Sequence, residues 1–126
     1  SECRTDPACI KELPLDVPIR IGDKAADGSQ LRPYIVWFGE YVTEYETAAK
    51  IIQEADIFVV IGTSLTVSPA SALIRYPHKS VPKFIIDPQK PDNSYNDDYL
   101  DLFEHIKMPA VAGMEAFVDR LLVLQY

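Results

Sequence analysis

The chain is poor in the residues that bind metals and form disulfide frameworks. Its 126 residues include two cysteines, Cys3 and Cys9, and two histidines, His78 and His105. The cysteine spacing matches neither a zinc ribbon nor a disulfide framework, and the histidines lie far away in the sequence. We therefore expect free thiols and no metal site. Neither histidine stands in a sequence pattern with a carboxylate or nucleophile that marks a catalytic pair, so both are interpreted as surface residues rather than catalytic bases.

Basic residues and long apolar runs are also scarce. The 12 basic residues are outnumbered by 19 acidic ones, and the net charge of -7 disfavours nonspecific binding to nucleic acid or anionic lipid. No apolar run approaches the roughly 20 residues of a membrane span, and the first ten residues lack the apolar core of a signal peptide. We expect a cytoplasmic protein whose partner is a small molecule or a basic peptide.

Apolar residues make up 48% of the sequence, which is enough for the core of one domain. Residues 1–33 contain four prolines and two glycines, a pattern that favours loops without a core. Three apolar runs predict buried strands: "YIVWF" at 34–38, "DIFVVIG" at 56–62 and "KFIID" at 83–87. The second run is apolar on both faces, which is typical of a parallel strand covered by helices on both sides.

Helices are predicted between and after these strands. Residues 44–55 have apolar side chains at helical spacing, and Thr43 with Glu46 matches a capping box. Ser68 and Pro69 suit the start of a short helix that runs to about residue 75. Residues 89–101 are polar and predict an exposed loop. A last helix carries apolar residues at helical spacing: Met114, Phe117, Val118 and Leu121. This alternation predicts an α/β fold with a parallel sheet.

Ligands of such sheets bind beyond the carboxyl ends of the strands, where Gly39, Gly62 and Asp87 should meet. After Gly62, the Thr63 and Ser64 hydroxyls and backbone N–H groups suit ribose or phosphate oxygens. Asp87 follows 25 residues later, near the usual distance of a ribose acceptor. The alternatives are a turn whose hydroxyls cap its own backbone and a simple Asp-Pro turn.

An aromatic pair ends the first predicted strand. In "VWFGE", Trp37 and Phe38 precede Gly39. Such a pair can form the wall of a narrow slot for an alkyl chain. Alternatively, one of the two rings belongs to the core.

Two strings carry a family resemblance. "LRPYIVWFGE" at 31–40 and "IGTSLTVSPAS" at 61–71 resemble, in order and spacing, the signatures of sirtuins, the NAD-dependent protein lysine deacylases. The similarity continues through "FIID" at 84–87 and "MPAVAGMEAFVDRLL" at 108–122. The resemblance implies a partial Rossmann-like parallel sheet with flanking helices. It further implies that residues 31–126 are the C-terminal half of the NAD-binding domain and that residues 1–30 are an irregular remnant of the small zinc-module region.

The resemblance also implies roles for individual residues. Those matching the NAD ribose, phosphate and adenine positions are Gly62, Thr63, Ser64, Asp87 and Ala110. Those matching the acyl-lysine peptide cleft are Val36, Trp37, Phe38, Gly39, Glu40 and Tyr41 on one wall, and Thr66, Val67 and Ser68 on the other.

The sequence departs from the family in several places. The glycine-rich loop, the glutamine-asparagine-aspartate motif and the histidine-glycine pair with the general base are absent from it, and neither zinc cysteine pair is reproduced. Asp87 stands where asparagine is usual, Ser68 replaces a common tyrosine and Thr43 a common proline. We therefore expect part of a deacylase that is inactive alone, with zinc unlikely. The alternatives are a noncatalytic NAD or ADP-ribose-binding module and an interaction module that forms a homo-oligomer through an exposed sheet edge.

Overall fold

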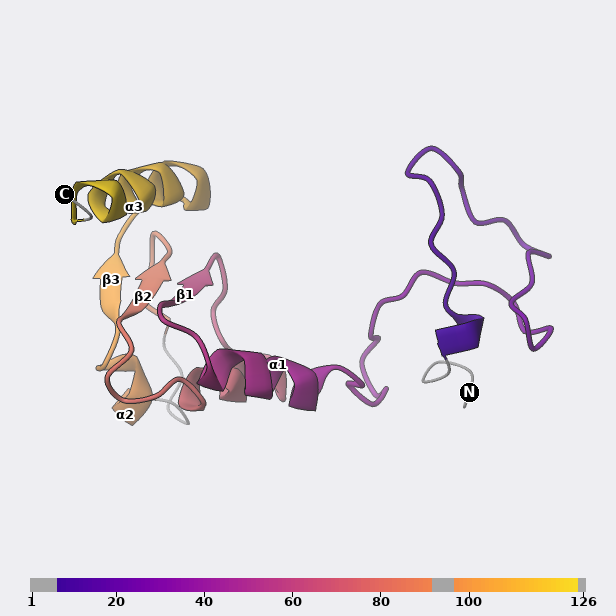
Figure 1. The fold of residues 1–126 in the computed structure, drawn as a ribbon, viewed down its shortest axis with the longest axis horizontal. Coiled ribbons are helices and arrows are strands. Elements are labelled where there is room, and N and C mark those ends of the chain that lie inside the picture. Colours follow the sequence, from indigo (N-terminus) through magenta and orange to yellow (C-terminus); the bar gives the residue numbers. More distant parts are fainter. Residues whose placement is uncertain (1–6, 92–96, 125–126) are drawn as a thin grey trace. The chain divides into compact units, whose positions relative to one another are not determined.

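The computed structural model describes residues 7–91 and 97–124. The chain divides into two units, Ser1–Thr43 and Glu44–Tyr126 (Figure 1).

The second unit contains a parallel sheet. Its strands are β1 (Phe58–Ile61), β2 (Lys83–Ile86) and β3 (Glu104–Ile106), in the order β1-β2-β3. Ile61 of β1 is in register with Ile86 of β2, which is in register with Ile106 of β3. The connections carry the 3-10 helix η3 (Ala70–Arg75) and the short helix α2 (Asp97–Leu100). The helix α1 (Tyr45–Gln53) precedes the sheet and α3 (Ala110–Leu124) follows it.

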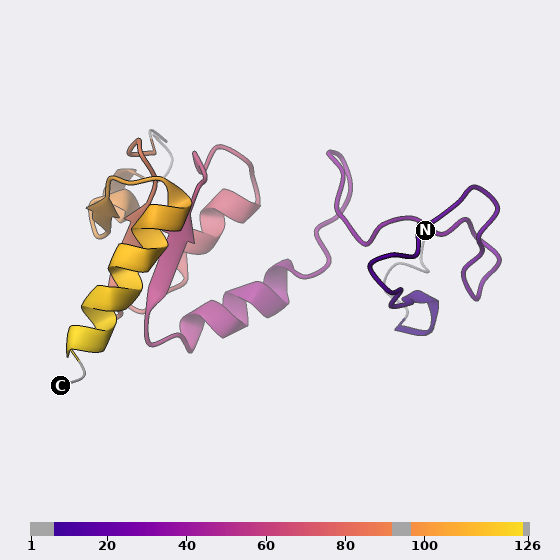
Figure 2. The same cartoon turned by 90° about the horizontal axis from the view of Figure 1, so that it is seen from above.

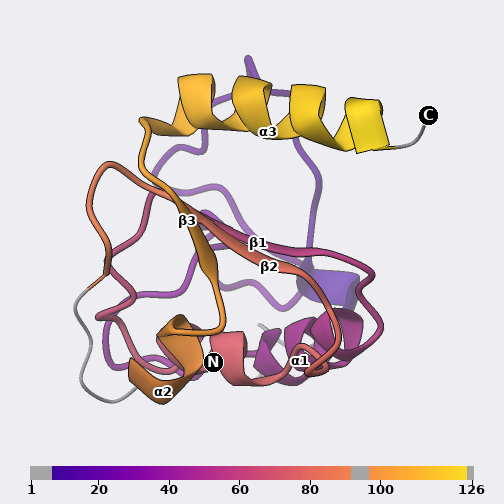
Figure 3. The same cartoon turned by 90° about the vertical axis from the view of Figure 1, so that its left-hand side faces the viewer.

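Helices lie on both sides of this sheet. Figure 3 shows α3 on one side and α1 with α2 on the other, and Figure 2 shows α3 lying across the strands. Because successive side chains of a strand point to opposite faces, β1 and β2 each contribute to two cores. This is a partial Rossmann-like parallel sheet with flanking helices, as the sequence predicted.

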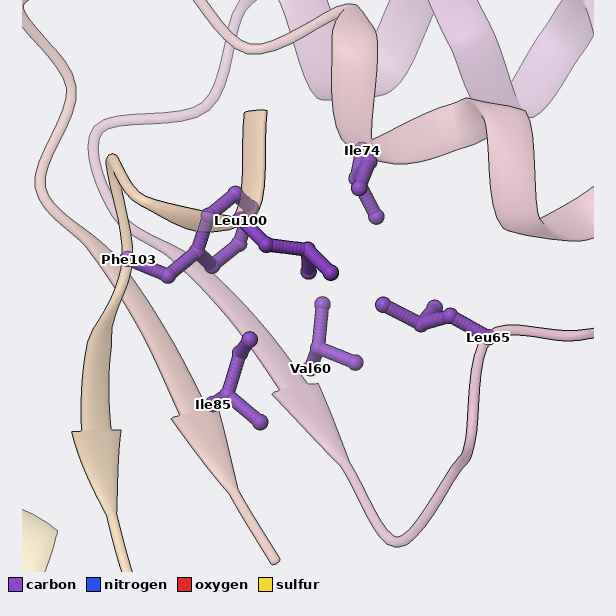
Figure 4. Close-up of a cluster of buried hydrophobic side chains, with 6 residues drawn as sticks. All are labelled: Val60, Leu65, Ile74, Ile85, Leu100 and Phe103. Carbon is purple, nitrogen blue, oxygen red and sulfur yellow. The ribbon is translucent and has the colours of Figure 1, made fainter. Parts of the chain in front are cut away.

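The two cores use neighbouring residues of the same strands. On one face, Val60 and Ile85 point toward Ile74 of η3 (Figure 4), in a cluster that also contains Leu65, Leu100 and Phe103. On the other face, Phe84 and Ile86 pack against Phe117 of α3, together with Val59, Ile106, Met114 and Leu121. The rings of Phe84 and Phe117 are 4.8 Å apart between centroids. The two-sided apolar pattern of the second predicted strand is thereby confirmed.

The predicted helices exist, but their predicted caps do not. The N-cap of α1 is Glu44, which makes no side-chain capping hydrogen bond, so Thr43 lies one residue too early for the capping box. The N-cap of η3 is Pro69, again without a side-chain bond, and Ser68 likewise lies one residue too early. Both errors have one cause: each helix begins one residue later than the sequence signal indicated.

The predicted buried strand at residues 34–38 is wrong. These residues form no strand, and all five are exposed. A strand needs a partner to satisfy its backbone groups. The one β-bridge among the described residues of the first unit joins Lys24 and Gln30 instead. The third strand of the sheet is β3, which the sequence pattern missed because three residues, Glu-His-Ile, show no alternation or β-branched run.

The first unit has no buried hydrophobic residue in its described part, since every buried hydrophobic side chain lies at Ala49 or beyond. It contains the 3-10 helix η2 (Pro7–Cys9) and hydrogen-bonded turns, and the Gln30 side-chain amide donates to the Arg20 carbonyl at 2.9 Å. Cys9 is disulfide-bonded, so the expectation of free thiols is wrong for this residue, because sequence spacing alone does not decide pairing. Cys3 lies outside the described residues.

The expected exposed loop at 89–101 is also corrected. Residues 92–96 lie outside the described part, but α2 follows them, and its Leu100 is only 2% exposed. Leu100 belongs to the core cluster with Phe103. The buried side chain of Leu100 thereby packs this polar segment against the sheet. An ion pair of 3.0 Å between Lys90 and Asp101 spans the connection.

Candidate functional site

The carboxyl ends of the parallel strands bring two predicted residues to one edge. The Gly62 N–H donates to the Ile86 carbonyl at 3.0 Å, and the Asp87 N–H donates to the Ile106 carbonyl at 3.2 Å. Gly62 and Asp87 therefore follow neighbouring strands at the same edge, as predicted. Gly39 does not end a strand, because residues 34–38 form none. It belongs to the first unit, so the predicted convergence of three strand ends is not observed.

The turn after β1 contains two residues with positive φ. Gly62 has φ +61, and a Cβ there would meet nothing within 4 Å. Leu65 has φ +56, and its buried side chain is 6% exposed. The Thr63 hydroxyl accepts from the Leu65 N–H at 3.1 Å, and the Ser64 and Thr66 hydroxyls are 3.0 Å apart. The hydroxyls thus bond locally, as the structural alternative predicted, while the backbone beside Gly62 stays open.

The N–H groups of Thr63 and Ser64 donate to no other residue in the described ranges. Successive N–H groups in a turn can bind an anionic or hydroxyl oxygen. The same turn borders a mostly apolar cavity of about 270 Å³ between α1, β1 and η3, whose lining includes Ile52, Val60, Thr63, Leu65 and Val67. The edge therefore combines open backbone donors with a neighbouring apolar hollow.

Asp87 is held on several sides. Its carboxylate Oδ1 accepts from the Gln89 N–H at 2.9 Å, which is the local turn that the alternative interpretation predicted. Its carbonyl lies 2.7 Å from Nε2 of His105. Among the described residues no hydrogen bond reaches Oδ2, which leaves one carboxylate oxygen for a ligand. Ala110, the first residue of α3, is exposed.

Two residues of this region escaped the sequence interpretation. His105 is half-buried and bonded to Asp87, so its assignment as a surface histidine is wrong, whereas His78 is exposed and bonds Ser80 at 2.7 Å. Gly113 lies in α3, where a Cβ would come within 2.3 Å of Cγ2 of Ile86. A glycine inside a helical pattern was the available signal for such close packing. No signal in the sequence pointed to the partner of His105.

In the first unit, Arg32 and Glu40 close the loop that contains four of the predicted peptide-binding residues, Val36, Trp37, Phe38 and Gly39. Arg32 donates from Nη1 to Oε1 of Glu40 at 2.6 Å and from Nη2 to Oε2 at 2.8 Å. The hydrogen bonds to the Glu40 carboxylate raise the pKa of Arg32. Nη2 also donates to the Ile35 carbonyl at 2.9 Å, and the Trp37 N–H donates to Oε2 of Glu40 at 2.9 Å. We call these four hydrogen bonds the Arg32–Glu40 clamp.

The rings of the aromatic pair, Trp37 and Phe38, take no part in the clamp. Trp37 is 58% exposed and Phe38 is 92% exposed, so neither ring belongs to the core. Gly39 adopts φ +84 in the turn closed by the Glu40 N–H and the Trp37 carbonyl, at 3.1 Å. Val36 and Tyr41 are exposed as well. The predicted residues of the second wall, Thr66, Val67 and Ser68, are exposed in the second unit directly after the Gly62 turn.

The described part of the chain contains no cluster of three or more histidine, cysteine, aspartate or glutamate side chains arranged for a metal. None of the helices in the described ranges has the length and apolar character needed to cross a bilayer.

Comparison with known proteins identifies the family. The sequence model of the Sir2 family matches residues 3–69, which is more than half of the chain. The chain belongs to the Sir2 family. It is 52% identical over 88 residues to an NAD-dependent protein deacylase of Bacteroides thetaiotaomicron, covering 69% of this chain and 38% of that relative. A Helicobacter pylori NAD-dependent protein deacylase is 45% identical over 71 residues, or 56% of this chain and 31% of the relative.

A third relative has a slightly different name. It is the NAD-dependent protein deacetylase of Oceanobacillus iheyensis, 39% identical over 77 residues, covering 60% of this chain and 32% of the relative. The Sir2-family chain thus spans 31% to 38% of the length of these curated relatives. The sirtuin resemblance found in the sequence is confirmed.

Proposed function

We propose that this chain supplies part of the NAD site and one side of the acyl-lysine peptide cleft of an NAD-dependent protein-lysine deacylase. One observation carries the proposal: the open backbone donors after Gly62 and the carboxylate of Asp87 lie at the same edge of a parallel sheet. Family membership and the NAD-dependent names of the relatives support this assignment.

Each group at the edge suits a different part of a dinucleotide. The N–H groups of Thr63 and Ser64 suit phosphate or ribose oxygens, and the missing Cβ of Gly62 allows the ligand to approach the backbone. Oδ2 of Asp87 can accept a hydrogen bond from a ribose hydroxyl. An aspartate keeps this acceptor but lacks the donor of an asparagine, so it also places a negative charge near the ligand. Ala110 is small enough to lie against an adenine edge.

The peptide wall uses main-chain groups. Val36 makes no backbone hydrogen bond within the described residues, while the clamp fixes Ile35 and Trp37 on either side of it. A free N–H and C=O on a fixed segment can pair with a substrate backbone, and such pairing binds many sequences because it does not depend on the substrate side chains. Trp37 and Phe38 would then contact the acyl-lysine chain. Thr66, Val67 and Ser68 match another peptide-binding segment of the family, and their proposed role is also to contact the substrate peptide.

In the family reaction the acyl-lysine oxygen attacks the nicotinamide ribose, nicotinamide leaves, and the acyl group passes to ADP-ribose. The residues of this chain bind and orient the reactants, since holding them together lowers the barrier without proton transfer by the holder. The base would come from the histidine of the family motif, which this sequence lacks. We therefore expect the 126-residue chain alone to consume no NAD, and turnover above the buffer rate would contradict this. In this proposal residues 31–126 form the NAD-binding half and residues 1–30 the small-domain remnant.

The NAD assignment is tested with Asp87→Ala and Asp87→Asn in the protein expressed from its complete reading frame. Loss of a hydrogen bond to a charged group weakens binding by about 10- to 100-fold. Calorimetry should therefore show this loss of ADP-ribose affinity for Asp87→Ala and a smaller loss for Asp87→Asn, which keeps an acceptor. Asp101→Ala is the matched control, because Asp101 precedes β3, at the opposite end of that strand from the edge. Absence of saturable ADP-ribose binding by the wild-type protein would refute the assignment.

A second candidate function rests on the free edge of β1. In the described residues β1 pairs only with β2, and Ile57 and Ile61 beside that edge are 40% and 41% exposed. An unpaired apolar edge can pair with a second copy of the chain. Sedimentation of the 126-residue chain should then show a dimer, and Ile61→Lys should dissociate it because the lysine blocks edge pairing. A monomer at high concentration would exclude self-pairing while leaving the NAD assignment intact.

A further inference from the structure

His105 links β3 to the turn that follows β2. Its Nε2 lies 2.7 Å from the carbonyl oxygen of Asp87, although the two residues are 18 positions apart. A carbonyl only accepts hydrogen bonds, so Nε2 carries the hydrogen. The histidine is half-buried. It therefore makes a directed contact with the backbone of a residue at the candidate NAD edge.

Among the described residues, the peptide bond that His105 reaches makes no other hydrogen bond. It joins Asp87 to Pro88, and proline has no N–H, so the carbonyl is the sole group through which a hydrogen bond can orient this peptide. On the other side of Asp87, its N–H donates to the Ile106 carbonyl at 3.2 Å. Strand β3 thus holds both backbone polar groups of Asp87, one through main chain and one through His105.

This arrangement affects the Asp87 carboxylate. The carboxylate is attached to a Cα whose two flanking peptides are both fixed by β3, and its Oδ1 is bound by the Gln89 N–H at 2.9 Å. Oδ2 of Asp87, by contrast, accepts no hydrogen bond from any described residue. Removing the His105 contact would free the Asp87–Pro88 peptide to rotate, and the turn that presents the carboxylate would rotate with it.

We propose that His105 is a positioning residue for nucleotide binding, which holds the Asp87–Pro88 peptide so that the Asp87 carboxylate is presented to a ribose diol. The proposal rests on the proposed NAD role of Asp87. His105 itself touches neither reactant and transfers no proton. This role requires a side-chain N–H that extends as far as the Asp87 carbonyl. A glutamine amide also supplies such a donor, whereas a phenylalanine ring does not.

The test compares three variants of the protein expressed from its complete reading frame. His105→Phe keeps a ring of similar size and removes the donor, and His105→Gln keeps an amide donor. His78→Phe is the matched control, because His78 is exposed and bonded to Ser80 in the turn before β2. Calorimetry with ADP-ribose gives the Kd, and steady-state deacylation of an acetyl-lysine peptide gives the KM for NAD and kcat. Thermal unfolding monitors stability.

Loss of one hydrogen bond corresponds to roughly a three- to ten-fold loss of affinity. His105→Phe should therefore raise the Kd for ADP-ribose and the KM for NAD by about this factor, with kcat within about two-fold of wild type. His105→Gln should recover most of the loss, and His78→Phe should match wild type. A purely structural role would instead lower the melting temperature without the split between KM and kcat or the recovery by glutamine.

Several outcomes would overturn the proposal. Unchanged ADP-ribose binding by His105→Phe would do so, as would a His105→Gln variant as weak as His105→Phe. If Asp87→Ala weakens binding and His105→Phe does not, the positioning role fails while the NAD role of Asp87 stands. If wild type binds no ADP-ribose, the proposed function fails and takes this inference with it.

If His105→Phe does not fold, a measurement on the wild-type protein tests the positioning role of His105. Nitrogen NMR of the imidazole should show hydrogen on Nε2, slow exchange of that hydrogen with solvent, and a shift on addition of ADP-ribose. An imidazole with an unprotonated Nε2, or one insensitive to saturating ADP-ribose, would refute the proposal.

Discussion

Replacing Gly113 with alanine would place a methyl group against the side chain of Ile86. The new Cβ would lie 2.3 Å from Cγ2 of Ile86, whereas two carbon atoms prefer a separation of about 3.5–4.0 Å. The helix α3 and the sheet would therefore have to separate by more than about 1 Å. Ile86 cannot turn away easily, because it is β-branched and 0% exposed between β1, β3 and α3.

The expected cost follows from two opposing terms. Adding a methyl group to a close-packed core costs about 1–3 kcal/mol, and a contact this short belongs in the upper half of that range. Alanine recovers about 1 kcal/mol because it favours the helix more than glycine does. The free energy of unfolding should fall by about 1–2 kcal/mol, which corresponds to a loss of roughly 5–15 °C in Tm for a unit of this size.

The assay is urea and thermal unfolding of the 126-residue chain, followed by circular dichroism of its helices. Val111→Ala is the matched control, because Val111 is in the same helix but 75% exposed. It gains helix propensity without touching the sheet and should be neutral or slightly stabilising, by about 0.5 kcal/mol. If Gly113→Ala is as stable as wild type or more so, Gly113 does not lie against Ile86 and the predicted clash is refuted.

Three further changes test other contacts. Glu40→Gln should weaken the clamp with Arg32 and lower the fluorescence anisotropy of the single tryptophan, and an unchanged anisotropy would show that the loop needs no clamp. Lys83→Met should lower the free energy of unfolding by about 1.5–3 kcal/mol, since the buried Nζ donates to three carbonyls, two of them at 2.7 and 2.8 Å; a loss below about 0.5 kcal/mol would contradict this. The ion pair with Arg120 lowers the pKa of Glu104 below its ordinary value of 4.5. Its stabilisation is present above pH 4.5 and is lost as the pH falls through the lowered pKa. The Tm difference between wild type and Glu104→Gln should therefore shrink on acidification, and a difference independent of pH would refute the pairing.

Much of the second unit could be predicted from local patterns. The two-sided apolar run that became β1 and the helical spacing of Phe117 in α3 depend on side chains close together in the sequence, and both predictions are confirmed. The parallel arrangement followed from the alternation of strands and helices. The strand-end positions of Gly62 and Asp87 then predicted that both residues lie at one edge of the sheet, and the structure places them there. Their ligands remain a proposal.

Other features depended on partners that local patterns do not specify. Residues 34–38 have the composition of a buried strand, but a strand exists only where a neighbouring backbone accepts its hydrogen bonds, and the described residues of the first unit offer none. β3 shows the reverse case, because three residues without a strand pattern pair with β2, whose ladder they complete. The predicted first residues of two helices were wrong by one position for a related reason. Capping signals indicate approximately where a helix begins, but the packing of the helix decides the exact first residue.

The sequence by itself determined the family, the two apolar faces of the strands and the candidate residues after β1 and β2, because these are encoded in the order of neighbouring side chains. Only the tertiary structure decided that His105 holds the carbonyl of Asp87 and that Gly113 lies against Ile86. Each of these contacts joins residues 18 or more positions apart, and the geometry of the sheet and α3, rather than any local pattern, brings them within bonding or packing distance.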